Sequence, residues 1–335
     1  MASIRTFLQR ADKKTKEEVQ RKRERNRSLT VLPKATQSAL GIGAIQKEDC
    51  VFQIGKNEYI KIYSVGLPLG ENRQAFMESL CGMTTNRIRL SVFCKNKEEK
   101  HRECMFMSIY FSGSNYADVY TQTQELDTKL KDQMNEKLHI SILACPIDSV
   151  LMFIHMNSAG EMKEYDITSL ANKKTAWKNS LYQPVTETTE GEFLCHGKYG
   201  ICFLGKLFPD HRADLDGIVR GINGNIQFVV DMQMPTGEDV QMQDHEIGKK
   251  YSCSIDTTNT RYINLSYLCT VLADSEKERM SAKKKISQVG IENEILFVPC
   301  CGRETEVFYS ICSLGIRDFR SMRNADMAFA SSLLL

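Results

Sequence analysis

The sequence contains no long apolar run. Nowhere in its 335 residues do apolar side chains approach the roughly 18–20 consecutive positions that a bilayer-spanning helix needs. Residues 1–30 also lack the apolar core of a secretory signal. These absences argue against a membrane-spanning or exported protein. We therefore expect a cytoplasmic chain, with any membrane contact peripheral and at the inner face of the cell membrane.

Paired cysteine motifs are absent as well. The chain has twelve cysteines, and none forms a CxxC pair. Scattered cysteines in a chain of this length are typical of reduced, buried side chains in a reducing compartment. Cys195-His196 and Cys202 lie close in sequence, but their spacing fits no zinc motif and no fourth ligand is evident. We therefore predict no metal site.

Catalytic signatures are also missing. The sequence has no GxSxG or HExxH motif and no paired-carboxylate signature. Gly200–Lys206 fits the GxxxxGK pattern of a phosphate loop, but Leu207 stands where Ser or Thr must hold magnesium, and the apolar residues between favour a strand. Asp244-His245-Glu246 lies in a polar segment without a positioned nucleophile. We predict a non-enzymatic protein without a cofactor.

What the chain does have is a globular composition and an uneven charge. Hydrophobic residues make up 42% and charged residues 26% of the sequence, and the length suggests about two domains. Residues 1–27 hold ten Lys or Arg against four Asp or Glu, a net charge of +6. This segment predicts a basic helical arm that contacts an anionic surface, or else a solvated helical extension. Its candidate contact residues are Lys13, Lys14, Lys16, Arg21, Lys22, Arg23, Arg25 and Arg27.

The hydrophobic pattern repeats at a distance of about 140 residues. In the first half a hairpin (50–65), a helix (75–81), an alternating strand (86–94), a helix (116–134) and a strand (138–144) are indicated. The second half gives the same order over 192–208, 215–222, 226–232, 275–288 and 294–300. The fold class predicted is α+β, with two successive ferredoxin-like (split βαβ) lobes. Each lobe would have a mixed or antiparallel sheet with helices on one face.

The predicted boundaries follow from this repeat. Residues 1–42 form the basic N-terminal arm and a linker, 43–156 the first lobe, 157–189 a polar linker and 190–335 the second lobe. The linker holds the only tryptophan, Trp177, which we expect at the joint between the lobes. Arg87 and Arg89 fall on the polar side of the strand over 86–94. With nearby tyrosines they predict a face for single-stranded nucleic acid or a partner, or else a solvated sheet face.

These features together resemble the N-terminal, non-motor region of the conjugative-transfer ATPases of type IV secretion systems, in particular those of Gram-positive mobile elements. The residues that carry the resemblance follow the basic arm in this order: Leu32–Gln37, Tyr59–Tyr63, the strand Arg87–Cys94, Trp177-Lys178 before Pro184, a strand ending at Pro209, Gly315–Arg317, Ala328–Ala330 and Ser332–Leu334. The sequence departs from the family at Glu48–Cys50 and over Thr236–Lys250.

The resemblance implies a role in DNA transfer without catalysis by this chain. In the family, this region docks the motor to the channel and helps hexamers form. We expect a motor-less scaffold at the cytoplasmic side of a conjugation channel, since the chain stops before any ATP-binding motif. The implied partners are further copies or a hexameric motor, channel proteins, the membrane surface and DNA. The alternative is a single-stranded nucleic-acid-binding module that uses the arm and the Arg87/Arg89 face.

Overall fold

A computed structural model describes residues 17–68, 72–97, 100–160, 191–215, 221–234 and 262–333, with short pieces at 164–165, 170–171, 182, 184–188 and 218. Residues 97, 100–101, 262 and 327–328 are described without their side chains. Lys13, Lys14, Lys16, Trp177 and His245, all singled out above, lie outside the described residues.

The described strands form one large sheet. Fourteen strands belong to it, and the main path runs β1-β2-β3-β4-β6-β5-β11-β12-β10-β9-β8, with β7 beside β4, β13 beside β10 and β14 beside β12. Every pairing between them is antiparallel. The strand bounds are β1 Thr30–Val31, β2 Ala44–Gln46, β3 Val51–Gln53, β4 Glu58–Val65, β5 Ile88–Lys97, β6 Lys100–Ser112, β7 Ile142–Ala144, β8 Thr186–Glu187, β9 Glu192–Cys195, β10 Lys198–Leu207, β11 Gly224–Gln233, β12 Tyr262–Ala273, β13 Leu296–Pro299 and β14 Arg323–Asp326.

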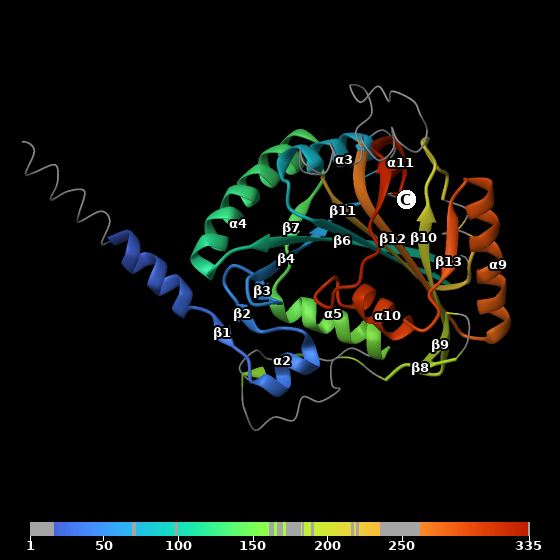
Figure 1. Cartoon of the computed structure of the whole chain (residues 1–335), viewed down its shortest axis with the longest axis horizontal. Helices are drawn as coiled ribbons and strands as arrows, with labels where there is room; N and C mark the ends of the chain where they lie inside the picture. Colours follow the sequence, from blue (N-terminus) through green and yellow to red (C-terminus); the bar gives the residue numbers. More distant parts are fainter. Residues whose placement is uncertain are drawn as a thin grey trace, which may run out of the picture.

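Helices cover both faces of this sheet (Figure 1). One face packs against α3 (Asn72–Met83), α4 (Tyr116–Leu130), α9 (Glu276–Glu292) and α11 (Met327–Ser332). The opposite face packs against α2 (Lys34–Leu40), α5 (Ile147–Ala159) and α10 (Glu304–Cys312). The α+β class is confirmed. The prediction of helices on one face only is wrong, because α5 and α10 bring a second helical layer that the sequence pattern did not reveal.

The central strands alternate as the pattern predicts. In β5, Ile88, Leu90 and Val92 join the core beneath α3 and α4, whereas Arg89 and Phe93 point to the opposite face. β11 repeats this arrangement and pairs with β5 from Gly224↔Asn96 to Met232↔Ile88. Because both faces of these strands are covered, the polar side chains of Arg89, Ser91, Gln227 and Asp231 are buried.

Two of the helices begin at side-chain caps. Asn115 Oδ1 accepts a hydrogen bond from Asp118 N at the start of α4, and Ser275 Oγ accepts one from Glu278 N at the start of α9. The predicted helix over 116–134 is present as α4 followed by a π-helical segment, Lys131–Lys137. The hydrophobic periodicity of the sequence does not predict the long strands β6 and β12.

The two halves of the chain share one undivided sheet. β5 belongs to the first half and β11 to the second, and their nine paired positions join the halves strand to strand. The prediction of one sheet in each of two lobes is therefore wrong. Hydrophobic alternation tells which face of a strand is buried but not which strand lies beside it, because ladder hydrogen bonds use backbone groups that almost every residue carries.

The order of elements nevertheless repeats. In the first half β7 pairs with β4, β4 with β6 and β6 with β5; in the second half β13 pairs with β10, β10 with β12 and β12 with β11. α4 and α9 occupy the same place in the two series, as do α5 and α10. A helix is expected over 215–222, between β10 and β11. The structure describes residues 215, 218, 221 and 222 of this range, and of these Ile218 is helical. Of the predicted recurrence of hairpin, helix, strand, helix and strand, the hairpin, the second helix and both strands are present twice in the described residues.

Candidate interaction surfaces

A buried ion pair lies where the two halves meet. Arg89 of β5 and Asp231 of β11 are direct cross-strand neighbours, and neither side chain is exposed (0% for both). The guanidinium donates from Nε to Asp231 Oδ1 at 2.8 Å and from Nη2 to Oδ2 at 2.7 Å. This two-point geometry compensates both charges in a site without water access.

The remaining donors of Arg89 hold the C-terminal part of the chain. Nη1 donates to the carbonyl and hydroxyl oxygens of Ser310 in α10 at 3.0 and 2.8 Å, and Nη2 donates to the Phe319 carbonyl at 3.0 Å. Burial by itself lowers the pKa of Arg89, but Asp231, Tyr110 and Asp318 together outweigh it, so the pKa lies above the usual value. Arg89 therefore stays charged and joins β5, β11, α10 and the segment after it.

Arg87 is engaged at the edge of the same network. Its Nη1 donates to both carboxylate oxygens of Asp318 at 2.9 and 2.8 Å, and its guanidinium lies 3.4 Å from the centre of the Tyr110 ring. Only 7% of the side chain is exposed. Tyr110 donates its hydroxyl to the Gly315 carbonyl at 3.1 Å, and burial raises the pKa of Tyr110 to about 12.

The prediction that Arg87 and Arg89 form an accessible face for nucleic acid is therefore wrong. Both arginines do lie on one side of the strand, as the alternation indicates. That side is covered by α10 and by residues 313–319, which lie more than two hundred positions further along the chain, so no local signal near β5 reveals the cover. The arginines join parts of the protein.

The basic N-terminal segment forms a helix over the described residues 17–27. This helix extends away from the body near the N-terminal end of α4 (Figure 1). Its C-terminal end is attached: the Arg25 guanidinium lies 3.7 Å from the centre of the Tyr120 ring, Lys22 pairs with Asp118 at 3.7 Å, and Asn26 Oδ1 accepts from Ala117 N at 3.0 Å. Arg21, Arg23 and Arg27 are exposed.

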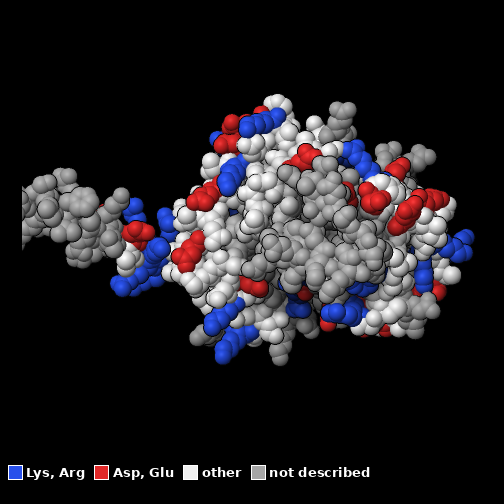
Figure 2. All heavy atoms as spheres, turned by 45° about the horizontal axis from the view of Figure 1, so that its top comes forward, with Lys and Arg blue, Asp and Glu red and all other residues white. Residues whose placement is uncertain are grey.

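The charge on this helix differs from that of the body. Figure 2 shows Lys and Arg side chains gathered on the projection, whereas both signs are interspersed over the visible body. The described helix holds five Lys or Arg against three Glu, a net charge of +2, and residues 1–27 together have a net charge of +6. The whole chain has a net charge of +2, so the remainder carries −4. The projection is thus positively charged, whereas the body is mildly acidic.

The candidate metal and nucleotide residues do not form a site. Cys195 Sγ donates to the Ser158 carbonyl at 3.5 Å, and the same oxygen contacts the His196 ring. Cys202 Sγ lies 3.1 Å from Thr270 Oγ1 between two strands. Within the described residues, no group of three or more His, Cys, Asp or Glu side chains could hold a metal ion. The Gly200–Lys206 segment lies in β10, so the prediction that it is a strand is confirmed.

Cys300 and Cys301 are a matched pair for a test of thiol chemistry. Cys301 is exposed, whereas Cys300 is buried, and burial together with Glu304 raises the pKa of Cys300 to about 12. Because the thiolate is the reactive form, only roughly one in ten thousand Cys300 thiols is ionised at pH 8. We expect iodoacetamide at pH 8 to modify Cys301 and to spare Cys300, as peptide mass mapping would measure. Equal labelling of both would contradict the buried position of Cys300.

Comparison with known proteins does not assign the chain to a class. No protein-family model matches it. No curated protein matches it either. Among the described residues, no helix combines the length and the hydropathy that a bilayer crossing requires. What the chain does is therefore inferred from its own residues.

Proposed function

We propose that this chain is a motor-less scaffold that assembles at the cytoplasmic side of a DNA-transfer channel of the type IV secretion kind. The observation that carries the proposal is the basic helix over residues 17–27, which projects from the body and is fixed to α4 at one end. A rigid body with a charged projection is suited to placing partners against an anionic surface. The resemblance described above supplies the channel and the hexameric motor as the partners to test.

We also propose that the two halves are diverged copies of one ferredoxin-like unit. In the first half the strands lie in the order β7-β4-β6-β5, and in the second half in the order β13-β10-β12-β11. Numbered along each half, both orders read 4-1-3-2, which is the antiparallel order of the split βαβ unit. α5 and α10 would then be additions to the unit, one in each copy.

The test of the basic helix uses four exposed side chains. We expect the intact chain to bind vesicles that contain anionic lipid, with an affinity that falls as salt rises. The variant R21Q/K22Q/R23Q/R27Q should bind at least tenfold more weakly, because each basic residue near such a surface contributes up to about 1 kcal/mol. Arg25 and Asn26 are left in place because they hold the helix against α4, whereas the exposed Lys22–Asp118 pair at 3.7 Å contributes little to that attachment. Vesicle flotation measures the binding.

A matched control removes the same charge elsewhere. The variant K129Q/K131Q/K137Q/K284Q also loses four positive charges, from exposed positions on the body. It should bind as the intact chain does. Equal losses in the two variants would mean that net charge, and not the helix, governs binding.

Light scattering of the intact chain, alone and mixed with a separate motor polypeptide, tests the scaffold role. A chain that stays monomeric and does not bind the motor would contradict that role.

Single-stranded nucleic acid is the second candidate for the basic helix. The same variants distinguish it, since phosphate contacts make the affinity fall steeply with salt. Salt-sensitive binding of single-stranded DNA by the intact chain, lost in R21Q/K22Q/R23Q/R27Q and accompanied by no vesicle binding, would favour this candidate. Arg87 and Arg89 are not part of it, because both are buried and paired.

A further inference from the structure

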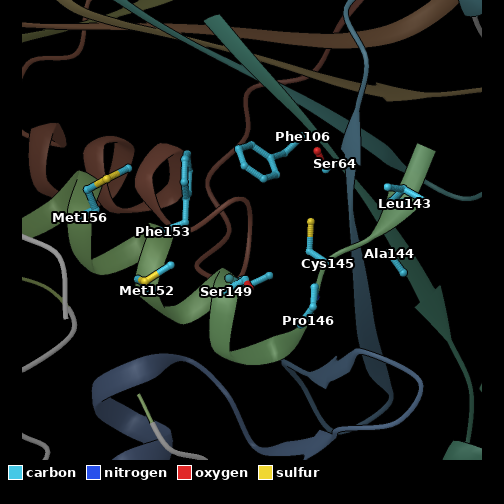
Figure 3. Close-up of a pocket in the computed structure, with 11 residues that line it drawn as sticks. Ser64, Phe106, Leu143, Ala144, Cys145, Pro146, Ser149, Met152, Phe153 and Met156 are labelled. Atoms are coloured by element: carbon cyan, nitrogen blue, oxygen red, sulfur yellow. The ribbon is translucent and has the colours of Figure 1, made fainter. Parts of the chain in front are cut away.

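A pocket opens between α5 and the strands β4, β6 and β7 (Figure 3). Its volume is about 500 Å³, and it lies on the sheet face opposite α3 and α4. The described lining contains no charged side chain. The lining residues are Ser64, Phe106, Leu143, Ala144, Cys145, Pro146, Ser149, Val150, Met152, Phe153 and Met156.

The pocket exists because α5 is apolar on nearly all sides. Val150, Leu151 and Ile154 pack against the sheet, as expected of a surface helix. Along the side of α5 that lines the pocket, Ser149, Met152, Phe153 and Met156 follow the spacing i, i+3, i+4, i+7. Met156 is 38% exposed, and Leu143 across the opening is 64% exposed.

The floor of the pocket is rigid and carries a neutral thiol. The Phe106 and Phe153 rings lie 4.4 Å apart, and Phe153 also contacts Phe93 at 4.8 Å. Cys145 points its sulfur into the space between Phe106 and Ser149 (Figure 3). Burial raises the pKa of Cys145 to about 11, so the thiol offers a weak hydrogen bond and no charge.

We propose that this pocket binds an uncharged, largely apolar small molecule. Its volume falls within the roughly 300–1,000 Å³ of small-molecule sites, and its apolar lining with a few hydroxyl and thiol groups matches the usual composition of such sites. A charged ligand would lose its hydration without gaining an ionic partner.

A protein partner fits less well, because a stable interface needs about 20–30 residues on each side. Here two large exposed apolar side chains, Leu143 and Met156, flank the opening, and the charged pair Lys47–Asp148 lies at the start of α5. The inference goes beyond the proposed scaffold role and does not depend on it.

The test uses the neutral dye Nile red with the intact chain. We expect saturable binding with one site per chain, measured by fluorescence. The variant L143K/M156K, which places two charges at the mouth from exposed positions, should bind at least tenfold more weakly. The control M280K/I291K adds the same charges at exposed apolar positions of α9, outside the pocket, and should bind within twofold of the intact chain.

Two competitors distinguish chain-like from aromatic ligands. 1-Decanol and 1-naphthol are both uncharged with one hydroxyl, and displacement of the dye by either supports the site and reports the preferred shape. Methyl NMR signals of Met152 and Met156 should shift on binding, and that of Met280 should not.

If L143K/M156K does not fold, Ser149→Trp replaces it. This variant fills the mouth of the pocket from an exposed position and should weaken dye binding by the same factor. Absent saturation, equal binding by both lysine variants, or displacement by neither competitor overturns the proposal.

Discussion

Replacing Asp231 with alanine is expected to lower the free energy of unfolding by about 3–5 kcal/mol. The carboxylate has no exposed surface and accepts two short hydrogen bonds from Arg89. Without it, the buried guanidinium stays charged, since Arg cannot deprotonate at accessible pH, and its nearest carboxylate is Asp318, 3.5 Å away and shared with Arg87. Urea denaturation followed by circular dichroism measures the change.

Two further variants separate the buried charge from other effects of the substitution. Asp274 pairs with Lys198 at the same 2.8 Å but is 64% exposed, so Asp274→Ala should cost less than about 1 kcal/mol. The double variant R89M/D231L leaves no buried charge and should recover a large part of the stability that D231A loses. A D231A variant no less stable than D274A would show that the two halves do not depend on this pair.

Gly315 is the second position where a small change should have a large effect. Its backbone has φ +88°, and a Cβ there would collide with the Tyr110 hydroxyl and lie 3.0 Å from Arg89 Cδ. We expect Gly315→Ala to cost about 3 kcal/mol or more, because backbone strain and overpacking each contribute roughly 1–3 kcal/mol. The loss should appear as a lower urea midpoint with an unchanged slope.

Gly302 provides the matched control for this substitution. It also has a positive φ, of +74°, but no atom lies within 4 Å of the position where its Cβ would be. Gly302→Ala therefore carries the backbone strain without the collision and should cost about 1–2 kcal/mol. The difference between the two variants measures how tightly residues 313–319 are held over β5 and β6. Equal losses would mean that this segment yields to the added methyl group.

Both predictions concern one place, the junction of β5 and β11. The body is expected to unfold as a single unit, because the sheet crosses this junction without interruption and α10 is hydrogen-bonded to Arg89. The basic helix lies at one end of the sheet and α9 at the other (Figure 1).

The candidate surfaces were predictable to different degrees. The charge of residues 17–27 is visible in sequence, because an exposed helix whose one apolar residue is Val19 needs no tertiary contact to be recognised. The pocket was not predictable. α5 is apolar on nearly all sides and shows no period, and its companion Leu143 belongs to a strand of three residues. Only the placement of β7 beside β4 brings Leu143, Cys145 and Phe106 around one space.

By itself the sequence determined the local structure: the alternation of β5 and β11, the helices α4 and α9, the strand that includes Gly200–Lys206, and the recurrence of these elements in two halves. These follow from side-chain periodicity and capping, which act over a few residues. The tertiary structure alone decided that the halves share one sheet and that Arg87 and Arg89 are buried. Strand neighbours are chosen through backbone groups common to almost all residues, and burial depends on segments that arrive from more than two hundred positions away.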